Sequence, residues 1–281
     1  MTVFDENERR AWAGRAEAYA NSFAKLCAHP VQALLDAARV GPGTRVLDVG
    51  TGTGTVAAAA CGRRAVVTAV DAEPGMVEPA ARNVPEADVR VAVLPGLPFE
   101  GNRFDAVVGN FVLNHVGQPR VALAELDRVA RPGGWIALTV WATPNAAGQA
   151  LLARAVQAAG VSRPAHLPPL APEDDFPRTE RGFTDLLLDA GLTHVSCESL
   201  TWDHRTDPDE WWSGPASGVA TIGQIIVNQQ PGTIARTRRH FDVLAAEFTA
   251  PDGLLVLPHR ALLACGRATW TDGGRAGAGR R

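Results

Sequence analysis

The segment Arg45-Val-Leu-Asp-Val-Gly-Thr-Gly-Thr-Gly54 decides the fold of this chain. It begins as a short β-branched run that is typical of a buried strand, and the residues after it, 55–61, suit a helix. Glycine at positions 50, 52 and 54 lets the backbone turn sharply and lie against a ligand, because a side chain there would occupy the ligand's space. The segment predicts a strand, a glycine turn and a helix whose N–H groups point at a bound molecule.

The next predicted strand ends in an acid, Asp71, which lies seventeen residues after Gly54. A carboxylate at that place can accept hydrogen bonds from both hydroxyls of a ribose. A dinucleotide fingerprint would need glycine at the sixth position of its motif, where this chain has Thr55, and here the acid Asp48 precedes the turn within the strand. The pattern therefore favours a nucleoside without a pyrophosphate. The alternative is that the glycines serve only a tight strand-to-helix turn.

Strand-like and helix-like segments alternate over most of the chain. Apolar side chains recur at spacings of three and four within residues 5–40, which predicts helices there, and further helices are expected at 121–130 and 182–190. Short β-branched runs predict strands at 45–49, 65–70, 88–94, 104–111, 135–141, 193–200 and 260–267. This order predicts an α/β fold with a doubly wound, mostly parallel, seven-stranded, Rossmann-like sheet.

Two insertions interrupt this pattern, at about 142–180 and at 203–250. In the first, 143–160 looks helical and 162–178 carries five prolines, which predicts a loop. The second contains helical runs at 216–228 and 234–248 and is longer than a normal connection, so we expect a mobile cap over the active site. Residues 1–40 would form N-terminal helices and 41–270 the main domain, and the Gly- and Arg-rich tail, 271–281, is expected to be disordered.

Composition narrows the classes of partner. A formal net charge of −3 supplies no basic face for a phosphate backbone, so nucleic acid is a poor candidate. The four cysteines lie far apart, without C-x-x-C spacing, which predicts reduced thiols and neither a metal site nor a disulfide framework. No apolar run approaches about 18 residues, so we expect no membrane span and, by default, a cytoplasmic protein. The oligomeric state stays open, with a homodimer as one option.

Four motifs in register resemble the class I S-adenosylmethionine-dependent methyltransferases, in the branch typified by ubiquinone- and menaquinone-biosynthesis enzymes. The likeness spans residues 44–141 nearly throughout. The motifs are Leu47-Asp-Val-Gly-Thr-Gly-Thr-Gly54, Val70-Asp-Ala-Glu-Pro-Gly-Met76, Leu97-Pro-Phe-Glu-Gly-Asn-Arg-Phe-Asp-Ala-Val107 and Leu126-Asp-Arg-Val-Ala-Arg-Pro-Gly-Gly134. The resemblance implies S-adenosylmethionine as the cofactor and S-adenosylhomocysteine as its product, and says nothing about the methyl acceptor.

The resemblance also implies which residues hold the cofactor. They are Tyr19, Asp48, Gly50, Gly52, Gly54, Asp71, Ala72, Met76, Asn110 and Phe111. Within this set Asp71 would bind the ribose, Ala72 and Met76 would contact the adenine, and Asn110 and Phe111 would lie near the sulfonium. Tyr19 would reach the cofactor carboxylate, with a helix-face core aromatic as the alternative. The family usually has an acid where this chain has Val93, so the adenine amino group must be held in another way.

Methyl transfer is an in-line displacement that depends on placing the acceptor and excluding water, so few catalytic residues are expected. His115 is the candidate general base, since family topology puts it near the reaction centre, and a histidine that merely packs or caps is the alternative. Asn114, Trp211 and Trp212 are the candidate contacts to the acceptor. For the tryptophans of the cap, ordinary packing is equally open.

The segment after the fourth strand, Gly109-Asn-Phe-Val-Leu113, lacks the Asn-Pro-Pro-Tyr type of sequence used on adenine or glutamine nitrogens. The predicted function is therefore methylation of a small, fairly hydrophobic organic acceptor at oxygen, nitrogen or activated carbon, in specialised-metabolite biosynthesis. Chemistry is grafted onto folds, so a cyclase or lyase that binds S-adenosylmethionine without transferring methyl is the alternative. A nicotinamide-dependent oxidoreductase and a non-catalytic binding subunit are further alternatives.

Overall fold

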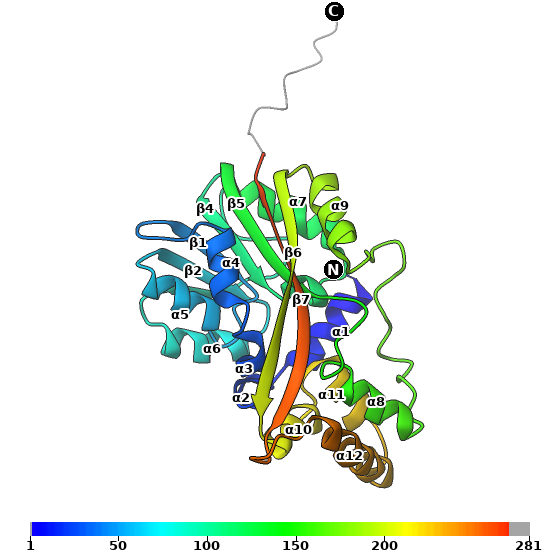
Figure 1. The fold of residues 1–281 in the computed structure, drawn as a ribbon. Helices are drawn as coiled ribbons and strands as arrows, with labels where there is room; N and C mark the ends of the chain where they lie inside the picture. The colour runs from blue at the N-terminus through cyan, green and yellow to red at the C-terminus, as the bar shows by residue number, and fades with distance from the viewer. Residues whose placement is uncertain (1, 270–281) are drawn as a thin grey trace, which may run out of the picture.

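The computed structural model describes residues 2–269, which form one seven-stranded sheet flanked by helices (Figure 1). The strand order is β3-β2-β1-β4-β5-β7-β6. The strands are β1 (Arg45–Val49), β2 (Val66–Asp71), β3 (Asp88–Val91), β4 (Phe104–Asn110), β5 (Ala130–Trp141), β6 (Thr193–Thr206) and β7 (Leu255–Arg267). The first five strands pair in parallel and β7 is antiparallel to both of its neighbours, which confirms the predicted doubly wound, mostly parallel fold.

Helices cover both faces of the sheet. On one face α4 (Val31–Ala37) and α5 (Thr55–Gly62) pack through fully buried side chains such as Leu34 and Ala57. On the other face α7 (Pro119–Val129) and α9 (Glu180–Asp189) contribute Leu123 and Phe183. The remaining elements before the cap are α1 (Val3–Trp12), α2 (Ala16–Ala20), α3 (Phe23–Cys27), α6 (Pro74–Asn83) and the 3-10 turn η1 (Val112–His115).

The chain order of the strands reverses between β1 and β4, which lie side by side at the centre of the sheet. Val46 of β1 pairs with Val67 of β2 on one side and with Ala106 of β4 on the other. Ligands of doubly wound folds bind at such a switch point, outside the carboxyl ends of the strands. The glycine turn follows β1 and therefore lies at this position.

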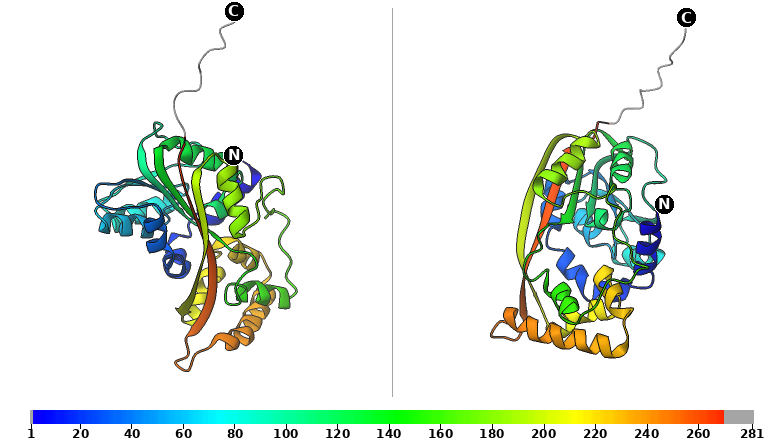
Figure 2. Two further views of the ribbon diagram at one scale, coloured as in Figure 1. Left: turned by 45° about the horizontal axis from the view of Figure 1, so that its top comes forward. Right: turned by 90° about the vertical axis from the view of Figure 1, so that its right-hand side faces the viewer.

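Strands β6 and β7 are longer than the predicted 193–200 and 260–267. Trp141 at the end of β5 pairs with Ala261, yet the β6–β7 pairing continues as far as Thr206 and Leu255. The two strands thus leave the sheet as a ribbon and reach the helical cap (Figure 2). The cap consists of α8 (Leu151–Ala158), α10 (Pro208–Ala216), α11 (Ala220–Val227), α12 (Pro231–Ala245) and the short turn η2 (Ala246–Phe248). Its core holds Leu151, Phe241 and Leu257, each fully buried.

The predicted helix over 143–160 is wrong in its first half, because α8 begins only at Leu151. Residues 142–149 instead run beside β7, where Ala142 donates to the Arg260 carbonyl at 3.3 Å and Gln149 to the Pro258 carbonyl at 3.2 Å. Pairing with a strand outweighs the local helical preference. The loop expected over 162–178 is confirmed, and the expectation for residues 271–281 lies outside the described residues. Within 2–269, no helix is both long and apolar enough to cross a bilayer.

Gly148 allows this close approach, and its replacement tests the packing. A Cβ at position 148 would lie 2.6 Å from Leu257 Cα, a backbone atom that cannot swing away. We expect Gly148→Ala to lower the free energy of unfolding by about 1–3 kcal/mol. The control is Gly62→Ala at the end of α5, where a Cβ meets nothing within 4 Å. Urea denaturation of both variants checks the prediction, and equal stability of the two would contradict it.

Candidate active site

The glycine turn after β1 is fixed by the neighbouring strand. The backbone N–H groups of Gly50 and Thr51 both donate to the Val70 carbonyl of β2, at 2.9 and 3.0 Å. Gly50, Gly52 and Gly54 all have positive φ, at 72°, 56° and 95°, which is the left-handed region that favours glycine. The turn is therefore formed by the protein alone and does not need a ligand to shape it.

A side chain at each of the three glycines would meet a different neighbouring residue. A Cβ at Gly50 would lie 2.7 Å from Val112 Cγ2, and one at Gly54 would lie 3.0 Å from Val84 Cγ2. These two positions are constrained by packing within the protein. At Gly52 the nearest atom is on the ring of Tyr19, at 3.3 Å. Contacts within the protein therefore account for the missing side chain at all three positions, and the room expected there for a ligand stays a prediction.

Two carboxylates, Asp48 and Asp71, accept hydrogen bonds from the turn. Asp71 accepts hydrogen bonds from the backbone N–H of Gly52 at 2.8 Å and of Glu73 at 2.9 Å. Asp48 is fully buried, and the Thr51 hydroxyl donates to its Oδ2 at 2.6 Å. Its other oxygen, Oδ1, has no hydrogen-bond partner within residues 2–269. Burial raises the pKa of Asp48 to about 7, against the lowering effect of the Thr51 hydrogen bond; the charge of Asp71 raises it slightly further, and the Ala57 backbone amide lowers it slightly.

A buried carboxylate oxygen without a partner fits a cationic ligand, and S-adenosylmethionine carries both an ammonium and a sulfonium group. Burial also raises the pKa of Asp71, although its two backbone bonds oppose that effect. Each Asp71 oxygen accepts only one of these bonds and keeps a lone pair for a ribose hydroxyl. The residues at the turn therefore fit the cofactor that the sequence motifs imply.

The Tyr19 ring, on α2, packs against the turn at Gly52. The ring also meets Trp12 edge-on at a centroid distance of 5.6 Å. Burial raises the pKa of the Tyr19 phenol well above its usual value, and its hydroxyl bonds to the thiol of Cys27. The phenol is therefore neutral at physiological pH and able to donate a hydrogen bond. Its place over Gly52 agrees with the predicted contact to the cofactor, which stays a prediction.

The end of β4 is fixed by hydrogen bonds to two elements, α3 and β5. Asn110 Nδ2 donates to the Cys27 carbonyl at 2.7 Å, and the Thr139 hydroxyl donates to Asn110 Oδ1 at 2.7 Å. The same Thr139 oxygen accepts from the backbone N–H of Phe111 at 2.9 Å. Phe111 has a φ of 61°, a conformation that bulky residues rarely adopt. Its ring stacks on Trp141 at 4.0 Å between centroids.

His115 lies in η1, directly after β4, and is held by the N-terminal helix. Its Nδ1 lies 2.7 Å from Glu8 Oε2 and 3.4 Å from Trp12 Nε1. An indole nitrogen can only donate, so Nδ1 can bond to Trp12 only when it carries no proton, and it can donate to Glu8 only when it carries one. The shorter distance to the carboxylate favours the tautomer with the proton on Nδ1. Trp12 then fixes the ring by an edge-on contact at 5.2 Å. The neighbouring Asn114 Nδ2 is buried and has no partner in the described part of the chain.

The other predicted site residues lie in three different surroundings. Met76 is buried at the start of α6, and Ala72 is partly buried just after β2. Trp211 of α10 belongs to a group of rings that begins next to the end of β4. Trp212 packs on Phe241 at 5.3 Å. Both tryptophans belong to the hydrophobic core of the cap, but Trp211 also has ring contacts with His204 and His259.

Sequence reasoning missed the histidines of this ring group, which we call the His–Trp cluster and define as His29, Trp202, His204, Trp211 and His259. Its members come from the α3–α4 connection, β6, β7 and α10. His29 Nε2 lies 3.3 Å from His204 Nδ1. The one available signal was the alternation Trp202-Asp-His204, which places two ring residues on the same face of a strand.

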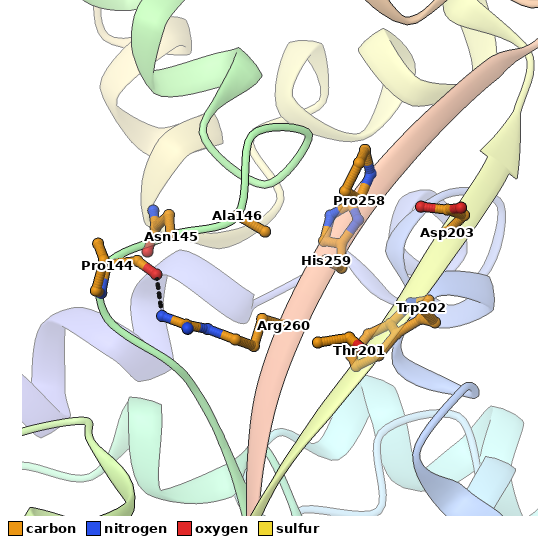
Figure 3. Close-up of a pocket in the computed structure, with 9 residues that line it drawn as sticks. All are labelled: Pro144, Asn145, Ala146, Thr201, Trp202, Asp203, Pro258, His259 and Arg260. Carbon is orange, nitrogen blue, oxygen red and sulfur yellow. Dashed lines mark hydrogen bonds between the residues drawn. The ribbon is translucent and has the colours of Figure 1, made fainter.

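An open groove of about 420 Å³ lies on the outer side of the β6–β7 ribbon. Figure 3 shows Arg260 reaching across it to the Pro144 carbonyl, with a hydrogen bond of 2.6 Å. Side chains alternate along a strand, so Arg260, Thr201 and Asp203 lie on the opposite face from Trp202 and His259. The groove's lining also includes Trp202 and His259, so it borders the ribbon at two residues of the His–Trp cluster.

The comparisons with known proteins concern mainly the first half of the chain. Residues 47–138 match the family model described as a methyltransferase domain. Over 112 residues the chain is 39% identical to the demethylmenaquinone methyltransferase of Renibacterium salmoninarum, which covers 40% of this chain and 47% of the relative. It is 40% identical over 121 residues to an uncharacterized methyltransferase of Mycobacterium bovis, with 40% of this chain and 58% of the relative covered. The chain thus spans about half the length of these curated relatives.

Solved structures extend the likeness to the fold of nearly the whole chain. The YcgJ protein of Bacillus subtilis matches with a TM-score of 0.53 and 18% identity, over 86% of this chain and 99% of the other. A Haemonchus contortus phosphoethanolamine N-methyltransferase, solved with phosphomonomethylethanolamine and S-adenosylhomocysteine, matches with a TM-score of 0.50 and 14% identity, over 85% of this chain and 52% of the other. At these identities the likeness concerns the fold.

Stability should depend on pH through His259, which is only 2% exposed. Burial lowers its pKa from 6.5 to about 4, against a smaller opposing effect of its bond to the Leu257 carbonyl; His204 and His29 lower it further. A histidine with a depressed folded-state pKa contributes stability above pH 6.5, and that stability is lost between pH 6.5 and about 4, because only the unfolded chain takes up the proton. At 1.36 kcal/mol for each unit, the loss is about 3 kcal/mol.

The measurement is urea denaturation of wild type and His259→Gln between pH 7 and 4. The raised pKa of Asp48 has the opposite effect, because it makes the folded protein more stable as the pH falls. Both proteins contain Asp48, so the difference between their stability curves reports on His259. Wild type should lose stability relative to the variant as the pH falls. Parallel curves would show that the pKa of His259 is not depressed.

Proposed function

We propose that this chain, whose residues 47–138 form a class I S-adenosylmethionine-dependent methyltransferase domain, transfers methyl to a small, fairly hydrophobic organic acceptor. The observation that carries the proposal is the acid-flanked glycine turn at the switch point of the sheet, with the unpartnered oxygen of buried Asp48. The acceptor nucleophile would be an oxygen, a nitrogen or an activated carbon. We place the reaction in specialised-metabolite biosynthesis.

The bound cofactor supplies an electrophilic methyl group on a positively charged sulfur. Asp71 would hold the ribose, Asp48 would offset positive charge, and Tyr19 would donate a hydrogen bond from above the turn. The N-terminal helices lie over the turn and exclude water from it, since Tyr19 contacts Gly52 and Asn110 bonds to the Cys27 carbonyl. Placing two reactants in line while keeping water out accounts for most of the rate of such a transfer.

An acceptor that must lose a proton needs a base, and we assign that role to His115. The Glu8 carboxylate would accept a hydrogen bond from the Nδ1–H of the imidazole, at 2.7 Å. This bond would fix the tautomer and leave Nε2 free to take up a proton. Histidine exchanges protons near neutral pH, and a positioned base typically contributes about 10²–10⁴ in rate. The proton would leave the acceptor as the new bond to the methyl group forms, and Glu8 would stabilise the resulting imidazolium.

The relatives bear on the nature of the acceptor. Several curated relatives are named demethylmenaquinone methyltransferases, and others are uncharacterized methyltransferases. A hydrophobic, ring-containing acceptor for this chain agrees with those names and with the aromatic side chains beyond β4. We place the protein in the cytoplasm as part of the same proposal, because its four cysteines are free thiols and such thiols persist in a reducing compartment.

The test of the proposal is a screen of candidate ring-containing acceptors with methyl-labelled cofactor. A methyltransferase must release S-adenosylhomocysteine in step with labelled product. Asp71→Asn removes a charge that would accept hydrogen bonds from the ribose, so we expect the cofactor to bind at least about tenfold more weakly. Asp36→Ala, on the exposed surface of α4, is the control and should bind normally. Product formed without S-adenosylhomocysteine would instead favour a cyclase or lyase, and an unchanged Asp71→Asn affinity would refute the ribose contact.

The base is tested separately with His115→Gln, which keeps a hydrogen-bonding side chain but cannot take up a proton at neutral pH. Turnover should fall at least about a hundredfold with cofactor affinity unchanged, and the acidic limb of the pH–rate profile should vanish. Glu8→Gln should lower turnover less, because the imidazole stays but loses its carboxylate. Glu6→Gln, exposed on the same helix, is the matched control. A loss below tenfold in His115→Gln would mean that the acceptor arrives already nucleophilic.

A further inference from the structure

The His–Trp cluster begins one ring away from the end of β4. Phe111 stacks on Trp141 at 4.0 Å, and Trp141 lies 6.1 Å from Trp202, a member of the cluster. A second connection runs through the backbone, since Asn110 donates to the Cys27 carbonyl and His29 follows two residues later. The cluster is therefore adjacent to the place where the methyl group would be presented.

The cluster contains three buried polar atoms that lack a hydrogen bond. Trp202 Nε1, Trp211 Nε1 and His204 Nε2 find no partner among the described residues. Trp211 is 3% exposed and His204 4% exposed, so surface water does not satisfy them. Buried donors are nearly always paired in folded proteins, and an unpaired one indicates a bound molecule or a function. Three such atoms in one group of rings indicate a site that is completed by a ligand.

Three rings of the cluster stack on one another with nearly parallel planes. Trp202 lies nearly parallel to His29, at 19° and 5.5 Å between centroids, and nearly parallel to His259, at 18° and 6.1 Å. Flat aromatic groups pack favourably against such faces in offset stacks. Trp202 is half-buried and His29 is exposed, whereas His204, Trp211 and His259 are buried. The cluster therefore reaches the surface of the protein at His29.

The cluster is also electrically neutral. Burial lowers the pKa of His204 and of His259 to about 4, so both imidazoles are uncharged at physiological pH. Lys25 and Glu210, the two charged groups that act on His204, pair with each other at 2.8 Å. Nothing in this surrounding offsets the charge of an ionic ligand, and desolvating an unpaired ion is costly. Two indole N–H groups can only donate, so the matching groups on a ligand are acceptors.

We propose that the His–Trp cluster is the acceptor site and selects a neutral, planar aromatic molecule whose oxygen atoms accept hydrogen bonds from the Trp202 and Trp211 indoles. This inference rests on the proposed methyl transfer and names its substrate class. The aromatic ring of the acceptor lies against Trp202, and its oxygens replace the missing partners of the two indoles. Trp202, Trp211 and His204 thereby become the residues that determine specificity.

The experiment uses three two-ring probes and calorimetry on the full chain saturated with S-adenosylhomocysteine. Chromone is neutral and carries two oxygen acceptors, naphthalene has the same shape without acceptors, and N-methylquinolinium is a cation. Chromone should bind wild type at least about tenfold more tightly than either other probe. This comparison needs no variant, so it stands even if a substitution impairs folding.

The variants then assign the effect to individual indoles. Trp202→Phe and Trp211→Phe keep an aromatic ring but lose the N–H, so each should weaken chromone binding about fivefold or more and leave naphthalene unchanged. Trp135→Phe, in β5 between the guanidinium groups of Arg39 and Arg267, is the matched control and should bind chromone like wild type.

Equal binding of chromone and naphthalene to wild type, or chromone binding unaffected in both indole variants, overturns the inference while the methyl-transfer proposal stands. Wild type that fails to bind S-adenosylhomocysteine contradicts the proposed function and, with it, the acceptor assignment.

Discussion

The hydrogen bond from the Gly52 N–H to the Asp71 carboxylate, 2.8 Å long, is the contact on which the rest of the structure depends. It joins the turn after β1 to the end of β2 and is reinforced by the bonds from Gly50 and Thr51 to the Val70 carbonyl. Because the turn is fixed in this way, α5 begins at a defined place, Gly50 can pack on Val112, and Tyr19 finds a flat surface at Gly52. The site is preorganised by the protein, so binding need not include the cost of shaping the loop.

The second structural constraint is the length of the β6–β7 ribbon. Its pairing continues to Thr206 and Leu255, beyond the last residue that β5 pairs with, and the cap helices pack on this extension. The cap is therefore not a separate domain on a flexible linker. It shares hydrogen-bonded strands with the sheet, and the same strands deliver Trp202, His204 and His259 to the carboxyl side of β4 and β5. One antiparallel pair thus both supports the cap and lines the space beneath it.

The sequence predicted those parts of the molecule whose signals are local. The strand, glycine turn and helix around Gly52, and the acid that ends β2, follow from residues within a few positions of one another, and the sheet type follows from their repetition. Glu8 and His115 are 107 residues apart, and His29 and His204 are 175 apart, so no local pattern announces either pair. The ribbon was predicted too short because Pro258 and the histidines weaken the β-strand pattern, whereas its pairing depends on a partner strand. The helix predicted from residue 143 begins only at Leu151 for the same reason, because the residues before it run beside β7.

The distribution of charge divides the site into two halves with different tasks. At the turn, two carboxylates are buried close together, and burial raises the pKa of both, so a bound cation would be stabilised by them and would in turn favour their ionised forms. In the His–Trp cluster, by contrast, the imidazoles of His204 and His259 are neutral and resist protonation. A proton leaving an acceptor in that space is therefore not taken up by the nearest buried histidines. The imidazole of His115 differs in its surroundings, because its Nδ1 lies 2.7 Å from the Glu8 carboxylate. Under the proposed mechanism, the proton of an acceptor would move toward the side of the site that holds the carboxylates, and away from the neutral His–Trp cluster.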